Sequence, residues 1–555
     1  MSPPQLRDTL LLVFTVFVCV PTRSLALPTA LSGDLTVVHV LDTGRQMSMR
    51  IDRDPVTGDL HYLRTSGSIY RVTLAPGGAT SERVHTSSDT GIASPQGFAF
   101  GPDGAIYIVG NQASGATTTA TIRRGTRIAG AGDAREWATL ASTAPYPLGG
   151  DLFNHLFNGI AVSPDGLFVY VNSGSRTDHG EVADHGGAYP GLREVPVTSN
   201  IFRLPSDGID LLLENDEAAL RGAGYLFAQG LRNSFDLAFA ANGDLFATEN
   251  SGDRDDSEEL NWIREGHHYG FPWRMGTNDT PQRAAGYDPD SDPLIDHEYY
   301  AWQHGLFHDD PTYPPPPAGV TFTDPVLNEG PDADMFRDPA TGEIRDASAL
   351  GVTVGTFTAH RSPLGLVFDA ENALGGEYQG KGFVLGWTRG DPAGDAGQGP
   401  FKDPGQDLLL VDLTRSGDSY RARVTRIAGG FANPVDAVLA GTKLYVLEHG
   451  GQGGIWEVSF PAAEPAARFR RGFVNGDESA DITDAVSVLL HLFAGLTIAC
   501  LDAADTNGDA RRDVSDAVYL LNFLFVGGPA PPAPFDSCGP ADSLDAACQP
   551  AAPCS

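Results

Sequence analysis

The chain has almost no cysteine outside its C-terminal end. Of its 555 residues five are cysteines; Cys19 lies near the start, and the others are Cys500, Cys538, Cys548 and Cys554. The long stretch between them must therefore be stabilised by core packing without disulfides. Four cysteines confined to a short exported segment predict two disulfides there, with three possible pairings.

Positive charge is also scarce. The chain has 37 Lys and Arg against 71 Asp and Glu, and its net charge is −34. Nucleic-acid binding needs basic stripes that contact phosphates, so this composition excludes a nucleic-acid partner. The same acidity suits bound divalent cations or a solvated extracellular surface.

Long hydrophobic runs are absent after the first residues. The apolar run Thr9–Val20 follows Arg7 and precedes a small-residue cleavage pattern at Ser24–Ala26. The run is shorter than the roughly 20 apolar residues that span a membrane. Residues 1–26 are therefore interpreted as a signal peptide, with a membrane anchor as the alternative, and we expect a secreted protein (periplasmic, extracellular or cell-surface) without a transmembrane segment.

Glycine and proline are abundant, with 66 and 40 residues, and they punctuate a repeated pattern. Each copy has an apolar strand, a turn of the Pro-Asp-Gly or Asn-Gly type, and a second apolar strand. Strand pairs that recur in this way predict an all-β six-bladed β-propeller with one four-stranded sheet per copy; separate sandwich domains are the alternative. The six copies begin at residues 49, 97, 159, 236, 365 and 436.

The pattern also predicts domain boundaries. The propeller should occupy residues 27–460, with an aromatic-rich insertion at about 273–355 that covers one mouth of the ring. Residues 461–468 include the sequence PAAEPAA, which is typical of a linker. The remaining residues, 469–555, differ in character because they contain two segments with helical spacing, each preceded by an acidic loop.

These two loops predict a small α-helical, EF-hand-like calcium module. Oxygen side chains at alternating positions wrap a calcium ion, and a backbone carbonyl at position 7 completes the set. In the first loop, position 1 is Phe473, which should weaken binding there. The second loop offers Asp505, Asn507, Asp509, the Arg511 carbonyl, Asp513 and Asp516, and the first offers Asn475, Asp477, Asp481 and Asp484.

Two loop-helix units of this kind resemble the dockerin type I module. The aspartate at position 12, where an EF-hand has glutamate, agrees with that family, whereas Phe473 and the cysteine-rich tail depart from it. The resemblance implies calcium binding and a possible cohesin-like protein partner. A general calcium-stabilised interaction domain is the alternative.

The stretch Gly230–Pro272 resembles the glucose/sorbosone dehydrogenases, which are soluble quinoprotein sugar dehydrogenases with six-bladed propellers. The matching motifs are Gly-Leu-Arg-Asn at 230–233, Thr-Glu-Asn at 248–250, Glu-Leu-Asn at 259–261 and Tyr-Gly-Phe-Pro at 269–272. His155, placed nine residues before Pro164, is a further match.

The resemblance implies roles for these residues. His155 would be the general base that takes the hydroxyl proton, while Arg232, with Asn233, would contact the cofactor pyrroloquinoline quinone (PQQ). The loop after the hairpin, Asn250, Ser251, Gly252 and Asp253, would face an activating calcium. The implied function is a secreted oxidoreductase that acts on sugars or related alcohols.

Two departures from that family keep other functions open. The loop at 250–259 is far more acidic than the family's, and the entry to the last repeat, Phe431–Asp436, lacks the family's closely spaced arginines. A second cluster, Asp178, His179, Glu181, Asp184 and His185, offers ligands for a metal. The alternatives are a non-catalytic propeller that binds glycans or proteins, and a metal-dependent hydrolase or lactonase.

Overall fold

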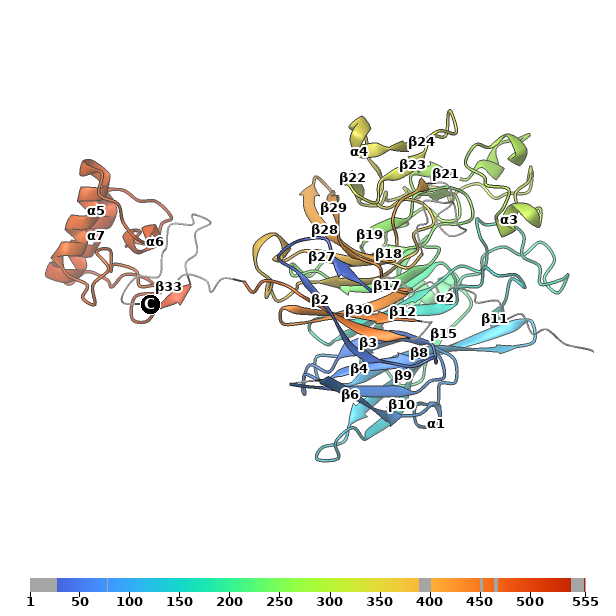
Figure 1. Ribbon diagram of the computed structural model, residues 1–555, viewed down its shortest axis with the longest axis horizontal. Helices are drawn as coiled ribbons and strands as arrows, with labels where there is room; N and C mark the ends of the chain where they lie inside the picture. The colour runs from blue at the N-terminus through green and yellow to red at the C-terminus, as the bar shows by residue number, and fades with distance from the viewer. Residues whose placement is uncertain are drawn as a thin grey trace, which may run out of the picture. The chain divides into compact units, whose positions relative to one another are not determined.

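The computed structural model describes residues 27–76, 78–388, 401–449, 453–463, 468–540 and 554. The predicted signal peptide and Cys548 lie outside these residues. The chain divides into two compact units, one up to Ala462 and one from Ala463 (Figure 1). Among the described residues, no helix has both the length and the apolar character needed to cross a membrane.

The first unit is an all-β propeller. Its first two sheets follow the chain order of the repeats and are closed by antiparallel hairpins. One contains β3 (Ser48–Arg53), β4 (Leu60–Arg64), β5 (Ile69–Ala75) and β6 (Gly78–His85). The next contains β7 (Pro95–Phe100), β8 (Ile106–Ser114), β9 (Thr117–Arg127) and β10 (Arg135–Thr143), joined by β11 (Tyr146–Pro147) and β15 (Leu211–Leu213).

The third and fourth repeats form smaller sheets. The third sheet contains β12 (Phe157–Val162), β13 (Phe168–Ser173), β14 (Asn200–Pro205) and β16 (Leu226–Gln229). The fourth contains β17 (Ser234–Phe239), β18 (Leu245–Glu249) and β19 (Glu259–Ile263). Short helices α1 (Ser87–Thr90) and α2 (Glu217–Gly222) lie in the connections.

The last two sheets include the N-terminal strands. One contains β26 (Pro363–Phe368), β27 (Gly382–Gly386), β28 (Asp407–Ser416) and β29 (Ser419–Gly429), extended by β1 (Thr29–Ala30), β22 (Leu327–Pro331) and β25 (Val354–Gly355). The other contains β30 (Pro434–Ala440), β31 (Lys443–Glu448), β32 (Gly454–Ser459) and β2 (Thr36–Asp42). Because β2 pairs with β32, the start of the chain completes the last sheet.

The first strands of the repeats pack on one another in chain order, and β30 packs on β3 to close the ring. Apolar side chains from neighbouring sheets fill the spaces between them. Buried carboxylates reinforce these junctions: Asp436 Oδ2 accepts from the Ile51 amide at 2.8 Å, and Asp52 Oδ2 from the Phe100 amide at 2.7 Å.

The prediction of six four-stranded blades is corrected in one respect. Within the described residues, five sheets have four strands or more, so the structure has five complete blades, and the repeat at 236 forms only the three-stranded sheet β17–β19. After β19 the chain passes through Gly266, Gly270 and Pro272 into the insertion. His268 there makes single bridges to Gln229 and Phe322 instead of a ladder.

The predicted insertion is ordered where the structure describes it. It contains β20 (Arg274–Met275), β21 (Asn278–Asp279), η1 (Pro281–Arg283), η2 (Pro289–Ser291), α3 (Tyr300–Gln303), β23 (Met335–Arg337), β24 (Ile344–Asp346) and α4 (Ala347–Leu350). Ile295, Ala301 and Phe307 pack with Phe153 in one apolar cluster. Figure 1 shows α3, α4, β23 and β24 on the opposite side of the unit from β4, β6 and β10.

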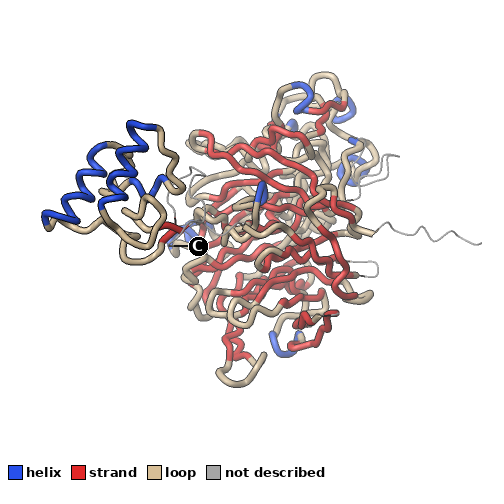
Figure 2. The backbone as a smooth tube through the Cα atoms, turned by 60° about the vertical axis from the view of Figure 1, so that its left-hand side comes forward, coloured by secondary structure: helices blue, strands red, loops and turns tan. Residues whose placement is uncertain are grey.

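The second unit has a helical core, drawn in blue in Figure 2. Helices α5 (Ile482–Ala494) and α7 (Val514–Val526) pack together, with α6 (Leu501–Ala504) between them in the chain. Each long helix begins with an aspartate capping box, Asp481 with Asp484 and Asp513 with Asp516, and ends at a left-handed glycine. The two predicted helical segments are thus confirmed.

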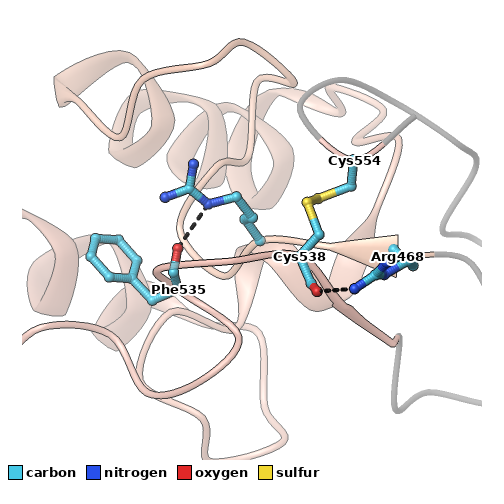
Figure 3. Close-up of a disulfide and its surroundings, with 5 residues drawn as sticks. Arg468, Phe535, Cys538 and Cys554 are labelled. Atoms are coloured by element: carbon cyan, nitrogen blue, oxygen red, sulfur yellow. Dashed lines mark hydrogen bonds between the residues drawn. A yellow bond between two sulfur atoms is a disulfide. The ribbon is translucent and has the colours of Figure 1, made fainter.

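One predicted disulfide pairing is resolved. Cys538 bonds to Cys554, beside the short pairing of β33 (Arg468–Phe469) with β34 (Gly539–Pro540) (Figure 3). Arg468 donates to the Cys538 carbonyl, and Arg470 Nε donates to the Phe535 carbonyl at 2.8 Å. The tail is therefore tied to the segment that enters the helical unit.

Candidate functional site at the mouth of the propeller

Two predicted site residues and one further arginine stand at the same position in their repeats. His155, Arg232 and Arg361 each stand two residues before the first strand of their sheets, β12, β17 and β26. The corresponding strands begin at the same end of the ring, which we call the mouth. The loops after the second strands of these sheets reach the same end because neighbouring strands are antiparallel.

The main chain places His155 next to Arg232. The Ser175 carbonyl accepts from the His155 amide at 2.9 Å, and the Ser175 amide donates to the Arg232 carbonyl at 2.6 Å. Gly174 is required for this approach, since a Cβ there would stand 2.5 Å from the His155 Cβ. The loop that follows β13 therefore joins the two site residues.

His155 is a neutral imidazole. Burial, together with the charge of Arg232, holds its pKa well below the usual 6.5, against the opposing charge of Asp178. Its Nε2 atom is buried and has no hydrogen-bond partner among the described residues. A neutral imidazole with an uncommitted nitrogen is suited to accept a proton.

The guanidinium of Arg232 is hydrogen-bonded to other groups of the protein. It is 4% exposed, its Nη2 pairs with Asp178 Oδ1 at 2.9 Å, and its Nε donates to the Asp178 carbonyl at 2.8 Å. Its Nη1 donates to the Asn250 carbonyl at 3.2 Å. Asn233 is also bound, because its Oδ1 accepts from Asn158 at 2.7 Å and its Nδ2 donates to Asn250 at 3.2 Å.

The cluster at Asp178 is an ion-pair network. Asp178 Oδ2 bonds His179 Nδ1 at 2.9 Å, and Glu181 accepts from the backbone amides of Asp178 and His179. Burial opposes ionisation of Asp178, but the His179 hydrogen bond and the Arg232 charge outweigh it and lower its pKa to about 2. These side chains satisfy one another. Within the described residues, no group of three or more His, Cys, Asp or Glu is arranged to hold a metal ion.

The acidic loop after β18 is clamped to the insertion. Arg254 pairs with Asp256 at 2.7 Å and with Asp292 at 2.9 Å, and Asp255 pairs with Arg337 at 2.6 Å. Asp253 Oδ2 accepts from the Ala301 amide at 2.8 Å. Calcium at Asn250, Ser251, Gly252 and Asp253 remains a prediction, with the Asn250 carbonyl already bound to Arg232.

Two groups at the mouth were not singled out from the sequence. His360 Nε2 bonds Asp255 Oδ1 at 2.8 Å, and this bond with the nearby carboxylates outweighs burial and raises the His360 pKa. Burial raises the pKa of Glu258 to about 8, against the charges of His360, Arg361 and Arg232. The sequence holds a signal for the segment that contains His360. Its neighbour Arg361 stands four residues before Gly365, just as His155 stands before Gly159 and Arg232 before Asp236.

The C-terminal loops are closed by hydrogen bonds from backbone amides to aspartate side chains. Asp505 Oδ1 accepts from the amides of Gly508 and Asp509 at 3.0 and 3.1 Å, and Asp516 Oδ2 from the Asp513 amide at 2.9 Å. In the first loop, Asp484 makes the matching bond to Asp481 at 2.9 Å. Phe473 is buried, 6% exposed, so the departure at position 1 is a core residue. Calcium binding by these loops remains a prediction.

The described part of the mouth does not fit the three carboxylates of PQQ. Among the residues that the structure describes there, the arginines are already paired: Arg232 with Asp178, Arg361 with Asp403 at 2.8 Å and Asp407 at 2.6 Å, and Arg337 with Asp255. A tri-anionic quinone would have to displace these carboxylates to gain a cation. We therefore assign no step of a reaction to that cofactor.

Residues 79–308 match the family model of glucose/sorbosone dehydrogenases. No curated protein matches the chain. The match includes His155, Arg232 and the acidic loop, and it ends within the insertion.

Similar solved structures have low identity. They include the family AA12 carbohydrate-active enzyme of Trichoderma reesei, with 16% identity, a TM-score of 0.47, and coverage of 78% of this chain and 97% of that one. The PQQ domain of pyranose dehydrogenase from Coprinopsis cinerea has 16% identity and a TM-score of 0.46, covering 77% and 96%. The soluble aldose sugar dehydrogenase of Escherichia coli has 14% identity and a TM-score of 0.44, covering 77% and 99%.

These scores are too low to support an inference about activity. The family model and the geometry of the mouth carry that argument. Over residues 79–308, the part that holds His155 and Arg232, the chain is similar to the glucose/sorbosone dehydrogenases.

Proposed function

We propose that the protein is a secreted oxidoreductase that oxidises sugars or related alcohols at the mouth of the propeller. The observation that carries the proposal is the neutral His155, with its unpartnered Nε2, inside the segment that matches the sugar dehydrogenase family model. Oxidation of an alcohol to a carbonyl releases a hydride and a proton. His155 accepts the hydroxyl proton, and the hydride passes to an external two-electron acceptor, which the test below supplies as an added quinone.

The residues around His155 set its proton affinity. The Arg232 guanidinium, held by Asp178, disfavours a second positive charge on the imidazole. The base is therefore in its active, unprotonated form over the whole neutral range. Because Nε2 is buried, proton transfer requires that substrate reach this atom.

The identity of the acceptor is the open chemical choice within this proposal. The matched family implies PQQ with calcium, whereas the described arginines are already neutralised by carboxylates. The test is to incubate the full chain with aldoses, calcium and either PQQ or a free benzoquinone, and to follow reduction of a dye. Aldose-dependent dye reduction that His155→Ala abolishes supports the proposal, and its absence with both quinones would overturn it.

We also propose that the loops at 475–484 and 505–516 bind calcium, with the tighter site in the second loop. The spacing of oxygen ligands and the Asx turns of Asp505 and Asp509 support this. The helical unit would then serve as a calcium-stabilised interaction module; docking to a cohesin-like partner is the role that the dockerin resemblance implies.

A further inference from the structure

A groove of about 590 Å³ lies between the outer strands of the first two sheets. One wall is the end of β6, Glu82–His85, with Asp89 of α1, and the other is the β9–β10 turn with the start of β10. Figure 1 shows β6 and β10 on the opposite side of the unit from α3 and α4. The described residues that line this groove include none of those at the mouth.

Three side chains that line the groove each hold a buried nitrogen without a hydrogen-bond partner among the described residues. They are His85 Nε2, Arg135 Nε and Trp137 Nε1. His85 is 6% exposed and Arg135 is 8% exposed, while Trp137 is partly buried. A buried polar atom without a partner destabilises the fold, and a ligand in the groove that bonds these nitrogens would recover that cost.

Packing and hydrogen bonds hold these side chains in place. The His85 and Trp137 rings meet edge to face, with centroids 5.5 Å apart and an interplanar angle of 88°. Gly125 of β9 makes room for the indole, since a Cβ there would lie 2.8 Å from the ring. Arg135 Nη1 donates to the carbonyls of Gly104 at 2.6 Å and Gly125 at 3.3 Å. Binding would therefore need little ordering of these side chains.

The charges of the groove favour a neutral ligand. Carboxylates and guanidiniums both line it, so an anion and a cation each meet groups of their own sign. These groups are Glu82, Asp89 and Asp133 on the acidic side and Arg83 and Arg135 on the basic side. The ligand should therefore be polar and uncharged.

The three nitrogens favour hydroxyl groups. Arg135 Nε and Trp137 Nε1 can only donate, so they need acceptors. Burial, together with the Arg135 charge, lowers the pKa of His85, and Nε2 of a neutral ring either donates or accepts. A sugar ring offers hydroxyls that accept and donate, and an apolar C–H face that can pack on the partly exposed indole of Trp137.

We propose that the groove between β6 and β10 is a binding site for a neutral glycan, which packs on Trp137 and bonds its hydroxyls to His85, Arg135 and Trp137. The volume is in the range usual for small-molecule sites. This site does not depend on the proposed oxidation at the mouth, because binding needs neither His155 nor an electron acceptor.

The test is binding of cellohexaose and maltohexaose to the full chain without any quinone. The chain has six tryptophans, so 15N labelling of tryptophan gives few indole signals, and Trp137→Phe identifies that of Trp137. We expect a hexasaccharide to shift this signal, and calorimetry to show binding about tenfold weaker in Trp137→Phe, as for loss of one hydrogen bond to the ligand.

The matched control is Trp456→Phe, which alters a similar edge-to-face pair, with His39 at 5.0 Å, in the last sheet. It should leave hexasaccharide binding unchanged. Failure of both hexasaccharides to shift the Trp137 signal would overturn the proposal, and so would equal weakening in Trp137→Phe and Trp456→Phe.

A second pair of variants leaves the buried side chains intact. Ala134 is exposed and lines the groove, so Ala134→Tyr should fill it and weaken hexasaccharide binding at least tenfold. Ala138→Tyr, at an exposed position of β10 outside the groove, should bind as the wild type does. Unchanged binding in Ala134→Tyr would contradict the site.

The competing occupant is an extended peptide. Within the described residues β6 pairs with β5 alone, so its outer edge could add a strand. An octapeptide of alternating threonine and valine is the probe for this mode. A shift of the Trp137 signal by this peptide, and not by either hexasaccharide, would assign the groove to strand addition and refute the glycan site.

Discussion

At the scale of single residues, the account depends on one nitrogen that has no hydrogen-bond partner, in a site where the neighbouring side chains are hydrogen-bonded to the protein. Arg232, Asn233 and Asp178 all have their hydrogen-bonding capacity taken by other protein atoms. His155 Nε2 has no such partner among the described residues. A buried polar atom without a partner costs about 1–3 kcal/mol, and a ligand that bonds His155 Nε2 would recover that cost.

His155→Ala should therefore abolish aldose oxidation while the protein stays folded. We expect a loss of about 10²- to 10⁴-fold in kcat, the usual contribution of a general base. Because the pKa of His155 is well below 6.5, the wild-type rate should not fall as the pH is lowered from 8 to 6. Steady-state rates across this range, with circular dichroism as the folding control, check both statements. A fall centred near pH 6.5 would contradict a depressed His155 pKa.

Arg232 should matter for stability as well as for the site. Arg232→Met removes one of the two partners of the buried Asp178 carboxylate, and loss of one member of a buried pair costs about 3–5 kcal/mol. Arg203→Met, which breaks the pair with the 63%-exposed Glu265, is the matched control, and it should cost about 1 kcal/mol or less. Urea unfolding measures both. Equal losses in the two variants would show that the Arg232–Asp178 pair is not specially important.

At the scale of elements, the first strands are joined by carboxylates with perturbed acidity. Burial raises the pKa of Asp52, in β3, to about 7, with the charges of Asp236 and Asp54 in the same direction and two backbone hydrogen bonds opposing. Because this folded pKa is above the usual value of 3.8, the Asp52 contribution is complete below about pH 4 and is lost as the pH rises through 7.

Asp52→Asn should remove this part of the pH dependence. The amide oxygen still accepts from the Phe100 amide, and no charge forms at high pH. The variant should be more stable than the wild type at pH 8, and the advantage should shrink at pH 5. Urea denaturation at the two pH values gives the comparison. A variant that is less stable by the same amount at both would contradict the raised pKa.

The calcium prediction belongs to the loops before α5 and α7. Calcium at one hundred times its Kd should stabilise the helical unit by about 2.7 kcal/mol, and a chelator should reverse the effect. Asp509→Ala should weaken binding at least tenfold in calorimetry on the full chain. Asp477→Ala, the equivalent change in the loop with Phe473, should have a smaller effect. Calorimetry that detects no calcium binding to the wild type would contradict the site.

At the scale of the whole molecule, the sequence predicts the repeated hairpins but not the structural features that occur only once. The turns at Pro102, Pro164 and Asn242 identify the propeller hairpins because each encodes a local structure. The three-stranded sheet could not be predicted, because the missing outer strand depends on where residues 264–272 find partners. His155 and Arg232 could be located from motifs, whereas the bond from Asp178 to Arg232 joins residues 54 apart.

The most direct test of the central claim is the His155-dependent oxidation of aldoses by the full chain. The protein is incubated with calcium and a quinone, either PQQ or a free benzoquinone, and dye reduction is recorded for the wild type and His155→Ala. We expect aldose-dependent reduction by the wild type and a loss of at least about 10²-fold in the variant. Equal rates in the two proteins, or no oxidation of any aldose with either quinone, would contradict the account.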